Sequence, residues 1–261
     1  MVESHIQGLA KHTSFTVVSH NNKGYSKGFY MILDGSEDYL KFDSYDEHYN
    51  HPGGIQVIGD YLICAVENSS NDQSHIRLYD LSGASVKQAP KIISTFDIQS
   101  DQHGAGAVGI ANYSEGKDEY YLVAATDKEK CRIYRSKPNQ EIQSASFSEL
   151  FQYDLPYQFQ NIALVCDTQN TVYLIGFRDK YKITTYEDSL EIYSIDIQAK
   201  KLANVKSIHM HTNHGDIIGL AGVHFRWGAG IKIKSENEFK LYATQRNFVS
   251  GVVCTNVFSK K

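Results

Sequence analysis

Three histidines occupy the same position of a repeated pattern and are the first candidates for chemistry in this chain. Each lies three residues before a glycine that begins an apolar run: His5, His51 and His103. Neutral imidazole is a common ligand of zinc and other divalent ions, and three imidazoles leave a coordination position open for water. The pattern therefore raises the hypothesis of a divalent metal such as zinc, although it does not identify a cofactor. The alternative is that each imidazole hydrogen-bonds to a neighbouring strand.

Two carboxylates and a further histidine end apolar runs at equivalent places. Glu67 and Asp127 follow such runs in neighbouring repeats, and His20 follows an earlier one. Glycoside cleavage needs two carboxyl groups on either side of the bond, one as acid and one as base or nucleophile. We therefore take Glu67, Asp127 and His20 as catalytic candidates. The alternative for the two acids is a solvated loop position.

Four other side chains are candidates for holding a ligand: Gln158, Arg178, Trp227 and Arg246. A guanidinium group binds carboxylate or phosphate through two parallel hydrogen bonds. An indole ring can stack on a sugar or an aromatic ring. The alternatives are surface ion pairs for the arginines and a core position for the tryptophan.

The segments that carry these residues have the composition of β-strands. Runs of about four to eight residues rich in Val, Ile, Tyr, Phe and Thr alternate with clusters of Gly, Asn, Asp and Ser. A single turn of helix is expected, at residues 146–151. We therefore predict an all-β protein.

A unit of four such runs repeats along the chain. The clearest copy covers residues 51–58, 61–67, 75–81 and 91–96. A repeated unit is typical of propellers and solenoids and not of sandwiches. We expect five units within a single domain that spans residues 1–261. Their approximate limits are 1–49, 50–100, 101–155, 156–222 and 223–261.

Two of the opening segments carry a resemblance. The sequences HIQGLA at 5–10 and HPGGIQVIGDYL at 51–62 resemble the first strands of blades in β-propeller proteins as a broad class. Propellers have about four to eight four-stranded sheets around a central channel. Together with the five repeat units, the resemblance implies a five-bladed β-propeller with antiparallel four-stranded blades around such a channel. The last repeat has only three runs, so we expect a short or covered last blade, and a homodimer formed through its edge.

Strand direction would collect the candidates at one face of this propeller. If the first strand of a blade starts at one face, the antiparallel second strand ends at that same face. We therefore expect a site for a small molecule or carbohydrate at the channel mouth, with a metal-assisted hydrolase or lyase as one form. A lectin-like or protein-interaction propeller without catalysis is the alternative, and these residues do not decide whether the chain is an enzyme.

Composition excludes other classes of function. The chain has 26 Lys and Arg against 30 Asp and Glu, a formal charge of -4, and no basic stripe for phosphates, so we expect no nucleic-acid partner. No segment approaches the roughly 20 apolar residues of a membrane-spanning helix, so we expect no membrane partner. Four cysteines lie in apolar runs without a CxxC spacing, which favours a reducing, cytoplasmic location: Cys64, Cys131, Cys166 and Cys254.

Overall fold

A computed structural model describes most of the chain. The described residues are 4–22, 26–36, 38–43, 48–68, 73–98, 105–182, 185–210, 223–235, 238–245 and 255–259. They form antiparallel sheets throughout, with one short 3-10 helix, η1 (Ile142–Ser144). The prediction of an all-β chain is confirmed. The expected helical turn at 146–151 is wrong, because Phe147–Asp154 form a strand that pairs antiparallel with Lys130–Ser136.

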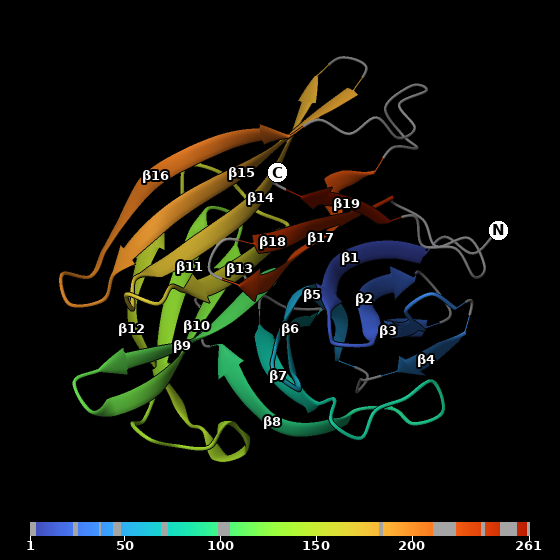
Figure 1. The fold of residues 1–261 in the computed structure, drawn as a ribbon, viewed down its shortest axis with the longest axis horizontal. Helices are drawn as coiled ribbons and strands as arrows, with labels where there is room; N and C mark the ends of the chain where they lie inside the picture. Colours follow the sequence, from blue (N-terminus) through green and yellow to red (C-terminus); the bar gives the residue numbers. More distant parts are fainter. Residues whose placement is uncertain are drawn as a thin grey trace.

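Four sheets have four strands each, in chain order from the inside of the molecule to the outside (Figure 1). The first contains β1 (Ser4–Lys11), β2 (Phe15–Asn22), β3 (Ser26–Leu33) and β4 (Tyr39–Asp43). The second contains β5 (Tyr49–Ile58), β6 (Tyr61–Asn68), β7 (Ser74–Asp80) and β8 (Lys91–Ile98). The third contains β9 (Ala107–Glu115), β10 (Asp118–Asp127), β11 (Lys130–Ser136) and β12 (Phe147–Asp154). The fourth contains β13 (Asn161–Cys166), β14 (Val172–Lys182), β15 (Thr185–Asp196) and β16 (Lys201–Met210).

The remaining sheet differs from these four. It contains β17 (His224–Ser235), β18 (Glu238–Thr244) and β19 (Thr255–Ser259), which are its three strands among the described residues. The prediction of five four-stranded blades is therefore wrong, since the structure has four such blades. The physical reason is that the last repeat supplies only three strand-forming runs. The homodimer expected at this edge stays a prediction.

The sheets surround a common axis in a β-propeller arrangement. The first strands β1, β5, β9, β13 and β17 contact one another in this order, and β17 contacts β1, so the ring closes. Each hydrophobic cluster lies between two neighbouring sheets. Between the fourth sheet and β17, for example, Phe177 and Phe225 meet edge to face with ring centroids 5.3 Å apart. The core is therefore divided into layers, and each sheet is covered on both faces.

Two glycines show how closely the inner strands approach. A Cβ atom on Gly53 would overlap the carbonyl oxygen of Gly106 in the next blade, and one on Gly230 would overlap that of Leu9. Backbone from neighbouring blades therefore passes where a side chain would otherwise stand. Within the described part of the chain, Cys64, Cys131 and Cys166 are free thiols, and Cys254 lies outside it. Within the described residues, no helix has the length and apolar character needed to cross a membrane.

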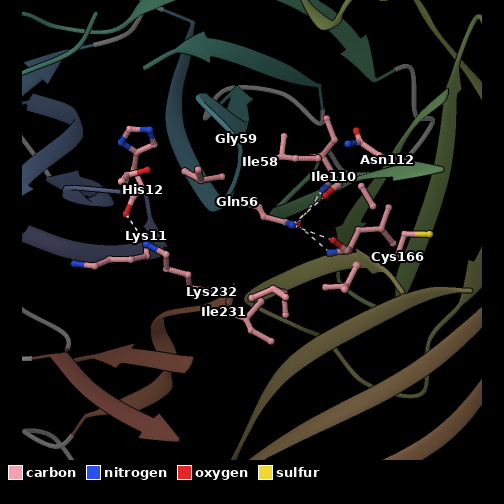
Figure 2. A pocket seen from close by; sticks show the side chains of 16 residues that line it. Lys11, His12, Gln56, Ile58, Gly59, Ile110, Asn112, Cys166, Ile231 and Lys232 are labelled. Atoms are coloured by element: carbon pink, nitrogen blue, oxygen red, sulfur yellow. Dashed lines mark hydrogen bonds between the residues drawn. The ribbon is translucent and has the colours of Figure 1, made fainter. Parts of the chain in front are cut away.

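One side chain joins three inner strands at the axis. The Gln56 amide nitrogen donates to the carbonyl oxygens of Ile110, at 3.0 Å, and Leu164, at 2.9 Å. The Gln56 amide oxygen accepts from the backbone nitrogens of the same two residues, each at 2.9 Å (Figure 2). Both N–H groups and both lone pairs of the amide are thereby used. Gln56 of β5 thus gives backbone groups of β9 and β13 the hydrogen-bond partners that a neighbouring strand would otherwise supply.

We predict that Gln56→Leu lowers the free energy of unfolding by about 3 kcal/mol or more, because it leaves four backbone groups of β9 and β13 without a partner. Urea denaturation measures this loss. The control is Gln143→Leu, which removes one exposed side-chain hydrogen bond to Tyr61 and should change stability by less than about 0.5 kcal/mol. Equal effects of the two substitutions would contradict a central role for Gln56.

Candidate functional site

Two carboxylates from neighbouring blades meet beside Gly106, where β6 and β10 end. A Cβ atom on Gly106 would lie 3.7 Å from Oε1 of Glu67 and 3.8 Å from Oδ1 of Asp127. Both oxygens lie within 3.8 Å of this one point, so their separation is below the limit of roughly 9.5 Å for the two carboxyl groups of a glycosidase. Gly106 itself is fixed by two backbone bonds, from its nitrogen to Thr126 and from the nitrogen of Gly54 to its oxygen, each 2.8 Å long.

His51 connects this carboxylate pair to the first blade. His51 pairs with Glu67 in the β5–β6 register, and its Nδ1 lies 3.2 Å from Oε2 of Glu67. The other ring nitrogen, Nε2, lies 3.1 Å from the amide nitrogen of Gln7. Because an amide nitrogen only donates, Nε2 of a neutral His51 must accept, and the ring proton is on Nδ1. His51 then donates to Glu67, which fixes one carboxylate oxygen and leaves the other beside Gly106.

The predicted metal triad is only partly within the described side chains. Both ring nitrogens of His51 have hydrogen-bond partners. His5 is placed in β1 opposite Asn21, and nothing is described of its side chain, whereas His103 lies outside the described residues. The described part of the chain contains no group of three or more His, Cys, Asp or Glu side chains placed to hold a metal. The three-histidine site stays a prediction.

Arg178 lies on β14 and is held from two sides. Its guanidinium carbon is 3.4 Å from the centroid of the Tyr157 ring, and its Nη1 is 3.5 Å from Oε1 of Glu191. Glu191 is buried and also accepts hydrogen bonds from Ser189, at 2.9 Å, and Ser207. Packing on an aromatic face leaves the outer edge of a guanidinium free to bind a planar anion. Arg178 is thus oriented in advance rather than mobile.

The other predicted ligand-binding residues have different surroundings. Gln158 is exposed in the segment between β12 and β13. Trp227 of β17 is buried, with 6 % of its surface exposed, and the Arg226 guanidinium lies 5.3 Å from its ring centroid. Arg246 lies outside the described residues. The structure therefore places Trp227 in the core layer, which is the alternative considered for it.

A buried cluster of charges on β14, β15 and β17 escaped the sequence analysis. His224 Nδ1 lies 2.9 Å from Oδ2 of Asp188, and both side chains are at most 5 % exposed. The backbone nitrogen of Phe225 donates to Oδ1 of Asp188 at 3.1 Å. Asp179, opposite Asp188 in the hairpin, has its pKa raised by burial, against the opposing effect of Arg226 at 3.2 Å. The sequence signal that could have revealed this cluster is the pair Asp179 and Asp188, which stand opposite each other in one hairpin.

A cavity lies at the opposite ends of the inner strands. Its volume is about 410 Å³, and residues of β1, β5, β9, β13 and β17 form its wall. Lys11, Ile58 and Cys166 are the last residues of β1, β5 and β13, so this cavity is at the exit of the inner strands (Figure 2). The sequence analysis considered the end of the ring at which the inner strands begin, and it assigned no candidate residue to the end at which they finish.

Comparisons with known proteins show the fold. No family model matches the chain, and neither does any curated protein. An endo-arabinase from Bacteroides thetaiotaomicron is similar in structure over 100% of this chain and 94% of its own, with a TM-score of 0.50 and 10% identity. A mutant Bombyx mori GH32 beta-fructofuranosidase in complex with sucrose is similar over 94% of this chain, with a TM-score of 0.50 and 11% identity. The chain spans 55% of that enzyme's length. The chain is thus a β-propeller of an architecture that glycoside hydrolases also use.

The third catalytic candidate, His20 of β2, is wholly buried. Burial, with a smaller effect from the charge of Lys41, lowers the pKa of His20 from its usual 6.5 to about 3. His20 is therefore neutral near pH 7 in the folded protein. An imidazole without exposed surface has no direct path to a ligand, which leaves Glu67 and Asp127 as the accessible members of the predicted catalytic set.

We predict that His20 makes the protein less stable in acid. Between pH 6.5 and about 3 the unfolded chain binds a proton that the folded protein does not, so the free energy of unfolding falls as pH drops through this window. The slope is at most about 1.4 kcal/mol per pH unit. Urea denaturation at pH 7 and pH 5 should show a smaller difference for His20→Gln than for the original chain. His209→Gln, at a side chain 67% exposed, is the control and should keep the original difference. An unchanged pH dependence in His20→Gln would refute the assignment.

Proposed function

We propose that this propeller acts on carbohydrate, as a hydrolase whose acid and base are Asp127 and Glu67 at the mouth of the inner-strand ring. The observation that carries the proposal is the position of Gly106. It leaves a space bordered by Glu67 Oε1 and Asp127 Oδ1, from two different blades. Most glycoside hydrolases cleave the glycosidic bond with two carboxyl groups that face one space.

The two carboxylates have different surroundings, which suggests different roles. Glu67 accepts the Nδ1 proton of His51, and His51 is itself held by Gln7. We assign the base or nucleophile role to Glu67, since the bond from His51 fixes one of its carboxylate oxygens and leaves the other beside Gly106. Asp127 then takes the role of the acid that protonates the leaving oxygen. Arg178, on the next blade, is the candidate for holding a polar group of the same ligand.

The architecture supports carbohydrate as the ligand class. The endo-arabinase and the sucrose-bound beta-fructofuranosidase share the arrangement of sheets with this chain, which supports the fold and leaves the chemistry to the site itself. A metal bound by His5, His51 and His103 is a further proposal, and it would require the His51 bond to Gln7 or to Glu67 to break.

We predict that Glu67→Gln and Asp127→Asn each lower turnover of a responsive glycoside by roughly 10²- to 10⁴-fold while the fold is kept. The substrates to screen are sucrose, arabinan and a panel of aryl glycosides, with release of reducing sugar or aryl alcohol as the measurement. Asp154→Asn is the control, because this carboxylate is 86% exposed on an outer strand. Turnover that survives both substitutions would exclude the assignment. Sugar binding without any turnover would favour the lectin-like alternative.

Gly106→Ala gives a second and independent prediction. The added methyl group would make only ordinary contacts of 3.6 Å or more, yet it would fill the space between the two carboxylates. We expect ligand affinity or kcat/KM to fall at least about tenfold with little change in stability, since the methyl displaces the ligand and not the backbone. The control is Gly83→Ala, whose methyl would meet only the exposed Gln88 amide at 3.8 Å. Equal affinity of the two variants would place the site elsewhere.

A further inference from the structure

The cavity at the exit ends of the inner strands has the features of a second ligand site. Its volume of about 410 Å³ lies within the range of roughly 300–1,000 Å³ that small-molecule sites occupy. Apolar side chains form much of the wall, including Val57, Ile110 and Ile231. Gln56 lies in the wall as well, but its amide is fully engaged with backbone. The bottom of the cavity is thus a rigid surface, and recognition must come from other side chains.

The ionisable lining of this cavity is basic. Lys11, His12 and Lys232 are among the lining residues, and no Asp or Glu is. This contrasts with the strand entrances, where Glu67 and Asp127 stand. Asp34 pairs with Lys11 and Asp60 lies 2.8 Å from His12, so the unmatched positive charge of the wall is that of Lys232, and this charge favours an anionic ligand.

The lysines differ in how much of their charge is already matched. The Lys11 ammonium is paired with Asp34 and also donates to Thr16 at 2.7 Å. The Lys232 ammonium donates to the backbone oxygen of His12 at 3.1 Å, and among the described residues it has no carboxylate within ion-pair distance. An ammonium group has three donors, so two donors of Lys232 remain for a ligand. Lys232 is half-buried, which strengthens its attraction for an anion relative to that of an exposed lysine.

A neutral polar group faces Lys232 from the other wall. Asn112 of β9 lines the cavity on the side away from Lys232 (Figure 2). Its exposed amide offers both a donor and an acceptor to a hydroxyl group. The cavity therefore presents one cation, one amide and apolar walls between them.

We propose that this cavity binds a small organic monocarboxylate, with the carboxylate on Lys232 and the body of the ligand between the apolar walls. A single unmatched ammonium balances one negative charge, because the charge of Lys11 is matched by Asp34. Sites for phosphate dianions often have guanidinium groups, and no arginine lines this wall. A hydroxyl on the ligand body, as in a sugar acid, would reach Asn112. The site is independent of Glu67 and Asp127, which lie at the entrances of the strands.

The test compares acids with their neutral counterparts on the full chain. Calorimetric titration with D-glucuronate, gluconate and acetate, against glucose and sorbitol, should show millimolar or tighter binding of at least one carboxylate and none of the neutral sugars. Lys232→Met should weaken that binding at least tenfold. Lys234→Met is the matched control, because Lys234 is two residues further along β17, is paired with Glu238 at 2.6 Å and does not line the cavity.

A second variant protects the test against loss of folding. Lys232→Met removes a hydrogen bond to His12 and could therefore unfold the protein. Asn112→Phe narrows the cavity without breaking a hydrogen bond, and we expect it to weaken carboxylate binding as well. Glu67→Gln should leave carboxylate binding unchanged, which separates this site from the proposed hydrolase site. The proposal is overturned if no carboxylate binds at millimolar concentration, if inorganic phosphate binds more tightly than every carboxylate, or if neither cavity variant weakens binding.

Discussion

The Gln56 amide at the axis is the interaction on which the rest of this structure depends. Its four hydrogen bonds tie the inner strand of the second blade to those of the third and fourth blades. Because the half-buried amide uses all its donors and acceptors on these strands, the bonds fix the position of the three strands relative to one another. This position brings the backbone of Gly53 against Gly106 and sets the end of β6 beside the end of β10. The carboxylate pair at one end and the cavity at the other are both consequences of it.

The two ends of the inner ring have opposite electrostatic character. At the strand entrances, Glu67 and Asp127 face the space beside Gly106. At the exits, Lys11 and Lys232 line a cavity without carboxylates. The side chains at the two ends of the inner ring therefore differ in charge, which favours different ligands for the two sites that we propose.

Buried charges help to hold the three-stranded sheet in the ring. Asp188 of β15 accepts from both the ring of His224 and the backbone of Phe225, which are the first residues of β17. Phe177 and Phe225 pack beside this pair. Removing one partner of such a pair is costly, because it leaves a buried polar group of the other without that hydrogen bond. The sheet with fewer strands is therefore joined to its neighbour by polar as well as apolar contacts.

The sequence by itself determined the strand-forming runs, their order and the pairing of successive runs, because these follow from local composition and from the period-two pattern of each strand. It also indicated that His51 and Glu67 lie at the same face, since antiparallel first and second strands of a repeat begin and end there. The tertiary structure decided the rest. Gln7 reaches His51 across 44 residues and Gln56 reaches Leu164 across 108, and such contacts exist only after the ring closes. Among the described residues the last repeat makes a three-stranded sheet, which fits the three runs counted in the sequence, so only four sheets are four-stranded blades. The tertiary structure also decided that His20 is buried. The basic cavity formed for the same reason, because its wall takes residues from the inner strands of all the sheets, and no single stretch of sequence contains that arrangement.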